Sequence, residues 1–360
     1  MKIGILTFYN VANYGAALQA WALSSFIKSL GHDVEFVNHT PPATADNFGS
    51  VLKNSLESNS IVKRIVKLLV LPVNLSLGLI KVKKYKKFVK KHLSENKYKD
   101  SVIGYDVVVV GSDQVWNYKL TGGYDDFFWG NAPYNGTKPK YIAYAASINQ
   151  LTFDNEEYVR KSLRNFEAIS VREEPAISLL SKYTDKDIVC VSDPTYLIDK
   201  DAWLEIINYA LIPKGKYLLI YPVGNVEETI RIGKRIAEKR GLKVVMMMSQ
   251  MTMKQNKESY FFDGPEGFIS KLSGATVVVT SSFHGTILST LFNKDFYSVK
   301  HEDGSNDRAS SLLNYLGLKD RLVSSYEDCQ NSAPIDYQKI NSKIEMFRQV
   351  SADYLKDSLK

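Results

Sequence analysis

Short apolar runs rich in β-branched residues alternate with helical patterns along most of the chain. Each run is bounded by turn residues, which is typical of strands buried in a parallel sheet. In the first part of the chain we expect such strands at Ile3–Phe8, Val34–Asn38, Val107–Val110, Tyr141–Ala145, Ala168–Val171 and Ile188–Val191. Helical spacing of apolar residues is found at Asn155–Phe166 and Glu174–Lys182. The alternation predicts a doubly wound α/β domain.

The same alternation restarts after Asp193-Pro194. We expect further strands at Tyr217–Tyr221, Lys243–Met247, Val277–Thr280 and Phe296–Val299, and further helices at Glu227–Arg240 and Pro265–Leu272. A chain of 360 residues exceeds the size at which one core stops growing. We therefore predict two α/β domains, 1–200 and 201–334, with a basic insertion at 51–100. The helical pattern within 335–360 is expected to pack back on the first domain, and a cleft between the domains would face one ligand.

Composition excludes several classes of protein. The chain is 44% hydrophobic and 24% charged, as in an ordinary globular enzyme. Its two cysteines, Cys190 and Cys329, form no motif, so we predict neither a disulfide framework nor a metal site. The strand pattern begins directly after Met1 and leaves no room for a signal peptide, and no apolar segment is long enough to span a bilayer. We expect a cytoplasmic protein.

The net charge of +7 is concentrated in one region. Residues 51–92 hold 11 Lys or Arg against the single acid Glu57, a local charge of +10. Seven lysines lie in Lys81–Lys91, where Val82, Tyr85, Phe88, Val89 and Leu93 fall on one helical stripe. One interpretation is a solvated helix docked by that stripe. The other is peripheral contact of 61–92 with an anionic membrane at its inner face, since uncharged Leu68–Ile80 precedes the lysines. No nucleic-acid module accompanies the lysines, so we expect no nucleic-acid partner.

The segment Thr276–Leu291 changes abruptly from a β-branched run into a helical pattern. The turn between them is Ser281-Ser282-Phe283-His284-Gly285. Small residues allow close approach of a ligand, and the first N–H groups of a helix attract an anion. The turn therefore predicts a phosphate site that includes Ser281, Ser282, His284 and Gly285. The alternative is a histidine that completes a loop hydrogen-bond network. The remaining histidines lie in segments that look exposed or irregular, namely His32, His39, His92 and His301.

Polar and small residues also follow the first predicted strand, in the run Asn10 to Gln19. Asn10, Asn13, Tyr14 and Gly15 would form a tight turn that admits a ligand, or an ordinary turn without one. The run lacks the GxGxxG spacing, so a dinucleotide site is not indicated.

Two more strand ends carry candidate chemistry. In Gly111-Ser112-Asp113-Gln114-Val115-Trp116-Asn117, Asp113 could accept a proton from a sugar hydroxyl or cap a helix, and Trp116 offers a flat surface for a sugar ring. In Ser170-Val171-Arg172-Glu173-Glu174, Arg172 offers two parallel donors to a phosphate or carboxylate, or forms a surface ion pair with Glu173 or Glu174. Arg308 is a further candidate from the second domain.

These motifs, taken in order, resemble the polysaccharide pyruvyl transferase family. The motifs are N-x-x-N-Y-G-A-x-L-Q, G-S-D-Q-V-W-N, S-V-R-E and S-S-F-H-G, and the resemblance runs from about residue 3 to about residue 322. It implies two Rossmann-like domains in a GT-B-like arrangement. It also implies transfer of pyruvate from phosphoenolpyruvate to a sugar as a ketal, during assembly of bacterial surface glycans. Phosphoenolpyruvate is then a co-substrate, no cofactor is expected, and the acceptor glycan is expected to be lipid-linked.

The resemblance also implies roles for particular residues. By position, Arg172 and His284 match residues associated with the donor, and Asp113 matches a position near the active site. We expect Arg172 to clamp the donor, His284 to bind phosphate and donate a proton, and Asp113 to act as base for an acceptor hydroxyl. Many members have arginine two residues before the histidine, where this chain has Ser282. Arg308 is the candidate replacement. The rival functions are a GT-B glycosyltransferase that uses a nucleotide sugar and a catalytically silent glycan-binding or assembly protein.

Overall fold

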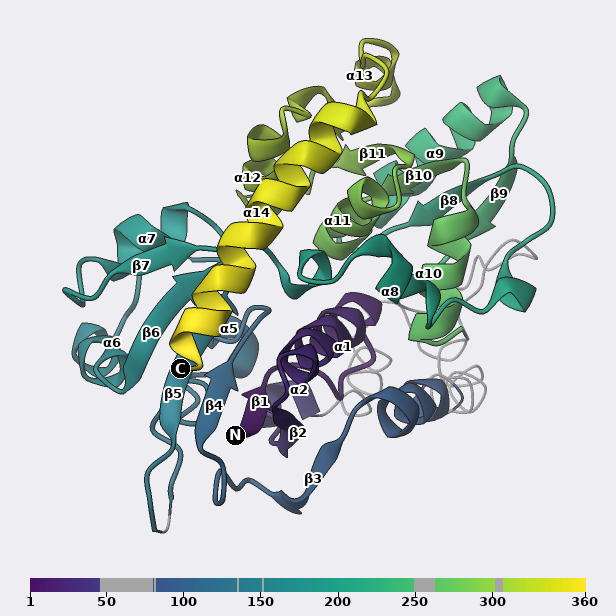
Figure 1. The fold of residues 1–360 in the computed structure, drawn as a ribbon. Helices are drawn as coiled ribbons and strands as arrows, with labels where there is room; N and C mark the ends of the chain where they lie inside the picture. Colours follow the sequence, from purple (N-terminus) through teal and green to yellow (C-terminus); the bar gives the residue numbers. More distant parts are fainter. Residues whose placement is uncertain (46–79, 81, 135, 151, 249–262, 302–306) are drawn as a thin grey trace, which may run out of the picture.

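The computed structural model describes residues 1–45, 80, 82–134, 136–150, 152–248, 263–301 and 307–360. These residues form two α/β units, each built on a parallel sheet (Figure 1). The first sheet has the order β3-β2-β1-β4-β5-β6-β7, and the second has the order β12-β11-β10-β8-β9. The predicted fold class, two Rossmann-like domains in a GT-B-like arrangement, is confirmed.

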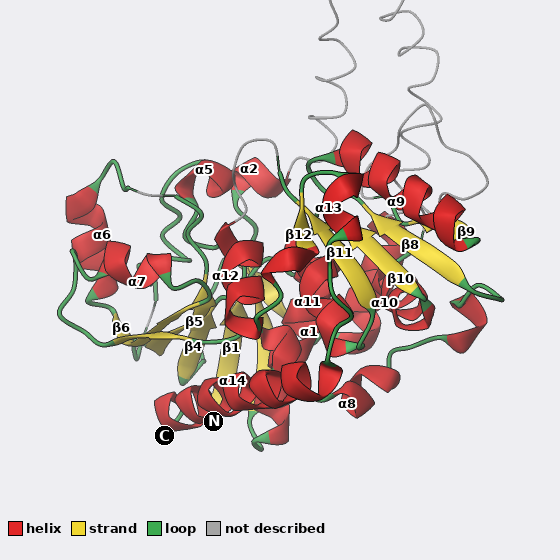
Figure 2. Cartoon of the chain, turned by 90° about the horizontal axis from the view of Figure 1, so that it is seen from above, coloured by secondary structure: helices red, strands yellow, loops and turns green. Residues whose placement is uncertain are grey.

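The strands of both sheets are short. Those of the first sheet are β1 Lys2–Leu6, β2 Asp33–Asn38, β3 Glu95–Lys99, β4 Val107–Val110, β5 Lys140–Ala146, β6 Phe166–Val171 and β7 Ile188–Cys190. Those of the second are β8 Tyr217–Tyr221, β9 Lys243–Met246, β10 Val277–Thr280, β11 Asp295–Val299 and β12 Leu322–Val323. The central strands β4 (VVVV), β10 (VVVT) and, after Lys2, β1 (KIGIL) are almost wholly buried and uncharged because helices cover both faces of each sheet (Figures 1 and 2).

Helices connect the strands and cover the sheets. They are α1 Tyr14–Ser29, α2 Pro42–Ala45, α5 Tyr118–Thr121, α6 Glu156–Leu163, α7 Pro175–Leu180, α8 Lys200–Leu204, α9 Val226–Arg240, α10 Pro265–Gly274, α11 Phe283–Leu291, α12 Asp307–Leu316, α13 Tyr326–Gln330 and α14 Tyr337–Ser358. Residues 82–92 are also helical, and we call them the lysine helix.

Among the differences from the prediction are two edge strands and the end of one helix. β3 and β12 were not predicted, because β3 has only one buried residue and β12 only two residues in all. Both are edge strands, where burial on one partner alone leaves a weak sequence pattern. The predicted helix Asn155–Phe166 is too long: α6 ends at Leu163, and Phe166 opens β6. Asn155 lies outside the helix as its N-cap and accepts a hydrogen bond from the backbone of Tyr158.

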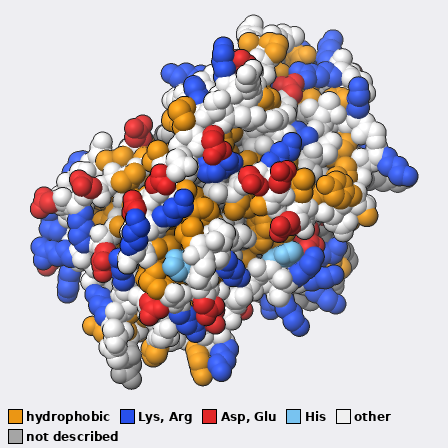
Figure 3. Space-filling view, in the orientation of Figure 1, with side chains coloured by type: hydrophobic (Ala, Val, Ile, Leu, Met, Phe, Trp, Pro, Cys, Tyr) orange, Lys and Arg blue, Asp and Glu red, His pale blue; other side chains and the backbone are white. Residues whose placement is uncertain are grey.

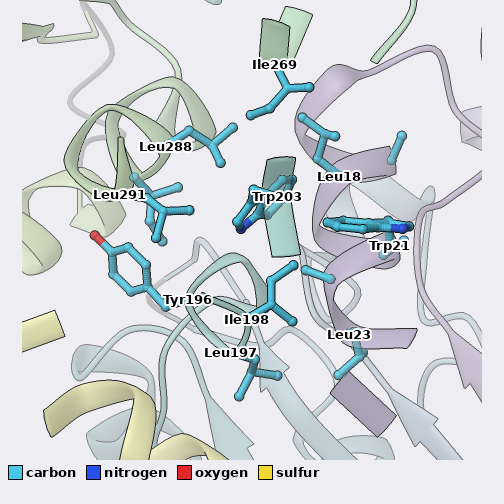
Figure 4. Close-up of a cluster of buried hydrophobic side chains, with 14 of the residues drawn as sticks. Leu18, Trp21, Leu23, Tyr196, Leu197, Ile198, Trp203, Ile269, Leu288 and Leu291 are labelled. Atoms are coloured by element: carbon cyan, nitrogen blue, oxygen red, sulfur yellow. The ribbon is translucent and has the colours of Figure 1, made fainter. Parts of the chain in front are cut away.

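A shared apolar core joins the two units. Figure 4 shows side chains of α1, α8, α10 and α11 meeting there, with Trp21 against Trp203 at a ring separation of 4.9 Å. Tyr14, at the start of α1, stacks on Phe268 of α10 at 5.0 Å and on Tyr85 of the lysine helix at 5.5 Å. Since α1 belongs to the first unit and α10 and α11 to the second, this core fixes how the two sheets face each other.

The C-terminal helix α14 crosses from the second unit to the first (Figures 1 and 2). Near its start, the amino group of Lys343 donates to the carbonyl of Leu316 in α12 at 3.0 Å. Near its end, the Ser351 hydroxyl accepts from the backbone N–H of Ser192 at 2.8 Å, and the Tyr354 hydroxyl donates to the carbonyl of Ala143 at 2.9 Å. The helix therefore ties the units together beside the strand ends that carry the site.

The lysine helix docks through Tyr85, Phe88 and Val89, which are buried. Its end is held by Glu266 of α10, which pairs with Lys91 and with His92 at 2.8 Å each. Much of the predicted basic insertion, 51–100, and of the predicted membrane-contact segment, 61–92, lies outside the described residues. Among the helices that the structure describes, none combines the length and apolar character required to cross a bilayer.

Candidate functional site

Arg172 stands at the centre of the candidate site, directly after β6. Its side chain is 2% exposed. Its Nη1 donates to Asp193 Oδ2 at 2.7 Å, its Nη2 lies 3.5 Å from Asp113 Oδ1, and its Nε lies 3.9 Å from Glu173 Oε2. Burial alone would lower the pKa of Arg172, but the charges of these three carboxylates raise it above its ordinary value. The alternative of a surface ion pair with Glu173 or Glu174 is wrong, because the ion pair is buried and its main partner is Asp193.

Asp193 is the carboxylate that joins the two units at this site. It follows β7, and its side chain is fully buried. One oxygen accepts from the backbone N–H of Thr195 at 3.0 Å, and the other receives Arg172 and lies 3.5 Å from Nε2 of His284. Burial raises the pKa of Asp193, but His284 and Arg172 together lower it by more. The pKa of this carboxylate therefore lies well below its ordinary range. Asp193 is therefore ionised at neutral pH.

Sequence reasoning did not select Asp193. The signal was present, because Ser192-Asp193-Pro194 comes directly after the predicted strand Ile188–Val191, as Asp113 and Arg172 come directly after theirs. In the sequence, the Asp-Pro pair indicates the point at which the alternating pattern restarts.

His284 is presented by the first turn of α11. Ser282 caps this helix by accepting from the backbone of Gly285 at 3.4 Å, and the Thr280 hydroxyl accepts from the backbone of Ser282 at 3.0 Å. The imidazole lies against Gly15 of α1 so closely that a Cβ at residue 15 would overlap its Nδ1. The tight turn after β1 and the histidine turn after β10 were predicted separately, and the structure brings them into contact.

Phe283 brings two guanidinium groups to one ring. The guanidinium carbon of Arg172 lies 4.7 Å from the ring centroid, and that of Arg308 lies 5.7 Å from it. Burial and the charge of Arg172 lower the pKa of Arg308 from its ordinary value. With its amide oxygen directed at Arg308, Gln114 accepts from both Nη atoms at 3.0 Å. The two arginines repel each other, and this arrangement favours an anion between them.

Ser281 and Asp113 hold the loops around this cluster. The Ser281 hydroxyl exchanges hydrogen bonds of 2.8 Å with the backbone of Val223, which follows β8. Asp113 has a φ of 69° and pairs through its backbone with Ser147 at 2.9 Å, while its Oδ1 accepts from the backbone of Gln114 at 2.9 Å. The alternative of a helix cap is wrong for Asp113, since Asn117 caps α5.

Two aromatic residues predicted in the site belong to the core instead. Trp116 is fully buried, stacks on Trp129 at 5.1 Å and donates to the carbonyl of Phe128 at 2.9 Å. The prediction that Trp116 offers a flat surface to a sugar ring is therefore wrong. Tyr14 is likewise buried, between Phe268 and Tyr85. These rings contribute stability rather than a ligand surface.

The remaining predicted loop residues and histidines have other roles. Asn10 and Asn13 are exposed, and Asn13 caps α1 through the backbone of Ala16 at 3.3 Å. The expectation that the other histidines lie in exposed or irregular segments is wrong for His92, which is helical and whose side chain is only 13% exposed. His39 does lie in an irregular segment, but its side chain is buried between Asp100 at 2.8 Å and Asp125 at 2.9 Å. These two carboxylates raise the pKa of His39 against the lowering effect of burial.

A cavity of about 200 Å³ opens beside the cluster. It lies between the loop after β5, helix α7 and the Arg308 side chain of α12. Its lining consists of Ile148, Asn149, Gln150, Glu173, Pro175, Ala176, Ser178, Leu179, Lys182 and Arg308. In the described part of the chain, no group of three or more His, Cys, Asp or Glu side chains is placed to hold a metal ion.

Comparison with known proteins gives one family match and several likenesses of fold. The family model described as polysaccharide pyruvyl transferase matches residues 13–303. No curated protein matches the chain.

Among solved structures, the chain is similar to a putative UDP-N-acetylglucosamine 2-epimerase from Listeria monocytogenes, with a TM-score of 0.50, 10% identity, and coverage of 100% of this chain and 96% of that one. The UDP-GlcNAc 2-epimerase from Neisseria meningitidis gives a TM-score of 0.46 at 9% identity over 100% and 99% of the two chains. A spinosyn rhamnosyltransferase gives 0.44 at 10% identity over 99% and 96%. The first of these likenesses supports the two-domain fold and nothing about the reaction.

The contact between Gly15 and His284 gives a first prediction. In Gly15→Ala, the added Cβ displaces the imidazole and changes its distance to Asp193, so the ring NMR signals of His284 shift. Gly233→Ala in α9 is the matched control, because its Cβ would overlap Ile220 in the core of the second sheet, far from the site. Unchanged His284 signals in Gly15→Ala, or the same shift in both variants, would contradict the contact.

The lowered pKa of Asp193 gives a second prediction, which concerns stability. A carboxyl whose pKa is depressed by folding stabilises the protein in full above its unfolded pKa, about 3.9, and loses that contribution as the pH falls from there through the folded pKa. Asp193→Asn should therefore cost about 3–5 kcal/mol of unfolding free energy, constant between about pH 5 and pH 8, and less below about pH 4. Denaturant unfolding across this range measures it, with exposed Asp201→Asn as control. A cost that grows as the pH falls would show that the sign is wrong.

Proposed function

The chain belongs to the polysaccharide pyruvyl transferase family, and on that premise we propose that it transfers pyruvate from phosphoenolpyruvate to a sugar of a bacterial surface polysaccharide or of its lipid-linked precursor, forming a pyruvate ketal. The observation that carries the proposal is the convergence of Arg172, Arg308 and His284 from both units around Phe283 and Asp193. Phosphoenolpyruvate carries a phosphate and a carboxylate, so two guanidinium groups and an imidazole suit its charges.

Arg172 is the proposed clamp for the donor. Its Nε and Nη2 are buried and have no hydrogen-bond partner among the described residues, although carboxylates lie 3.5 to 3.9 Å away. Such donors are costly to bury unless a ligand satisfies them. Arg308 offers a second buried Nε without a hydrogen-bond partner in the same part of the structure. It supplies the guanidinium that many family members have at the position of Ser282.

His284 is the proposed donor of the proton that the vinyl carbon of phosphoenolpyruvate receives. Asp193 faces its Nε2 at 3.5 Å, and Gly15 lies against the other side of the ring, so the imidazole is held in one orientation. Ser281, Ser282 and Gly285 belong to the same helix start, whose N–H groups favour an anion. Asp113, beside Arg172, is the proposed base for an acceptor hydroxyl.

One assay tests the function. The protein is incubated with phosphoenolpyruvate and candidate lipid-linked sugars, and phosphate release is measured together with the mass of the glycan. The proposal expects equimolar phosphate release and a pyruvate mass gain that consumes two hydroxyls. Transfer of a sugar from a nucleotide sugar instead would establish a glycosyltransferase, and binding of glycan without either reaction would establish a silent binding protein. Both results contradict the proposal.

In that assay, Arg172→Lys tests the clamp. Lysine keeps the charge that Asp193 requires but loses the planar fork, so kcat/KM for phosphoenolpyruvate should fall by about 100-fold. Exposed Arg160→Lys, whose guanidinium lies over the ring of Tyr183 at 5.5 Å, is the matched control and should be unaffected. Wild-type kinetics in Arg172→Lys would remove Arg172 from the donor site.

We also propose that the lysine helix contacts an anionic membrane, where a lipid-linked acceptor would lie. Its lysines are exposed on the face opposite the docked aromatic residues, and Figure 3 shows positive side chains gathered over this helix at the lower right. Among the described residues, Lys91 forms an ion pair and Lys83, Lys84, Lys86, Lys87 and Lys90 form none. Tyr85 of this helix packs on Tyr14, next to the Gly15 that touches His284, so the lysine helix lies close to the site.

Vesicle sedimentation tests the membrane contact. Each lysine near an anionic surface contributes about 1 kcal/mol. A variant that removes four of these charges should therefore bind anionic vesicles at least about 100-fold more weakly. Its substitutions are Lys83→Gln, Lys86→Gln, Lys87→Gln and Lys90→Gln. The matched control removes the same charge from exposed Lys214, Lys216, Lys239 and Lys243 of the second unit. Equal binding of the wild type to neutral and anionic vesicles at low salt, or equal losses in both variants, would contradict the proposal.

A further inference from the structure

Glu173 is a buried carboxylate that the proposed function leaves unused. Its Oε1 accepts from the Ser147 hydroxyl at 2.8 Å and from the backbone N–H of Ile148 at 2.9 Å. Its Oε2 is buried and has no hydrogen-bond partner among the described residues, although Arg172 Nε lies 3.9 Å away. One oxygen therefore fixes the side chain, and the other is available to a ligand.

The cavity of about 200 Å³ lies beside this carboxylate. Its walls include apolar Ile148, Pro175 and Leu179, and polar Gln150 and Ser178. The Gln150 side-chain oxygen is also buried without a hydrogen-bond partner among the described residues. Since a water takes up about 30 Å³, the space holds about six waters, the size of one sugar ring. Apolar walls with a few polar groups suit a ring that carries several hydroxyls.

The position of Glu173 relative to Arg172 gives it a place in the chemistry. A ketal joins two hydroxyls, so two hydroxyl protons must be removed. Two carboxylates flank the guanidinium of Arg172 at different nitrogens: Asp113 at Nη2, 3.5 Å away, and Glu173 at Nε, 3.9 Å away. If Arg172 holds the donor, both carboxylates lie next to the carbon that the two hydroxyls attack.

We propose that Glu173 is a second catalytic base of the transfer, and that the acceptor sugar sits in the cavity which Glu173 lines. This inference rests on the proposed function, because it names the group that deprotonates the first acceptor hydroxyl in the same site. It also places the acceptor, for which Trp116 had been the predicted surface, on the side of α7 and Arg308.

The transfer forms two bonds from hydroxyl oxygens to carbon and breaks one bond from carbon to phosphate oxygen. His284 gives a proton to the vinyl carbon, the first hydroxyl oxygen bonds to the adjacent carbon, and its proton passes to Glu173. The bond from that carbon to the phosphate oxygen then breaks, and the departing phosphate takes the proton from Glu173. The second hydroxyl oxygen bonds to the same carbon and its proton passes to Asp113. Solvent carries that proton away and restores the proton of His284, so the products are the ketal and hydrogen phosphate.

A purely structural role would also explain a buried glutamate, since Glu173 holds the turn at Ser147 and Ile148. Glu173→Gln separates the two roles, because the amide oxygen still accepts both of those hydrogen bonds while the group can no longer take up a proton. The charged groups near Glu173 are Arg172, Arg308 and Lys182. The charge of Glu173 also acts on Cys190, whose pKa is raised to about 12 mainly by burial. None of them is changed in this variant.

The experiment compares Glu173→Gln with Glu174→Gln, its exposed neighbour. Phosphoenolpyruvate binding is measured by calorimetry, and phosphate release is measured as a function of pH with the acceptor present. We expect Glu173→Gln to stay folded and bind the donor like the wild type, to lose about 100-fold or more in kcat, and to lose the acidic limb of its pH profile. Glu174→Gln should behave as the wild type does.

A third variant tests the cavity without touching the base. Exposed Ser178→Trp would fill the mouth of the cavity, so the acceptor KM should rise at least about tenfold with the donor KM unchanged. Ser181→Trp, at the exposed end of α7, is its control. If Glu173→Gln does not fold, this pair decides on the location of the acceptor.

The outcomes separate the inference from the function. A wild-type protein that releases no phosphate with any acceptor defeats the proposed function. If the wild-type protein turns over, two results would defeat only the inference. One is a kcat of Glu173→Gln within about threefold of the wild-type kcat, and the other is an unchanged acceptor KM in Ser178→Trp.

Discussion

The rest of the site depends on the buried carboxylate of Asp193. It accepts a hydrogen bond from Arg172 at 2.7 Å within the first unit and faces His284 of the second unit at 3.5 Å. A carboxylate that is fully buried is stable only when it is paired, and a buried guanidinium needs a carboxylate in the same way. Arg172 and Asp193 meet both requirements within the first unit, after β6 and β7, and His284 brings the start of α11 to the same place. The approach of His284 to the same carboxylate therefore lies where the two sheets meet.

Packing around the ion pair makes this meeting rigid. Gly15 lets α1 lie directly against the imidazole, and the aromatic residues of the shared core, among them Tyr14, Trp21 and Trp203, hold α1 against α10 and α11. On the other side, α14 binds the strand ends of the first unit through Ser351 and also contacts α12, which carries Arg308. The charged groups are thus placed by apolar contacts far from them in the sequence.

Features of the fold and the site could be predicted from the sequence when they depend on neighbouring residues, and not when they depend on contacts between residues far apart in the chain. Strands such as Val277–Val279 with their following helices are set by local hydrophobic patterns, so the fold class was predicted correctly. The start of α11 and the strand end at Arg172 were also recognised, because a polar residue directly after a buried strand is a local signal. Asp193 carried the same signal and was passed over.

Features that depend on long-range packing were missed or wrong. Trp116 looked like a ligand surface, but its burial is decided by Trp129 and Phe166, which come from other parts of the chain. Glu173 looked like a surface partner of Arg172, although the loop after β5 covers it. The edge strand β3 has a single buried residue and so no pattern from which to predict it. The assignment of roles to Arg172, His284 and Asp113 stays a prediction.

The most direct measurement is a calorimetric titration of the wild-type protein with phosphoenolpyruvate at neutral pH, compared with a sugar-charged nucleoside diphosphate. If the groups assembled around Asp193 form a site for a small molecule with a phosphate and a carboxylate, phosphoenolpyruvate binds at one site per chain and the nucleotide sugar does not displace it. If the nucleotide sugar binds and phosphoenolpyruvate does not, the account of this site is wrong.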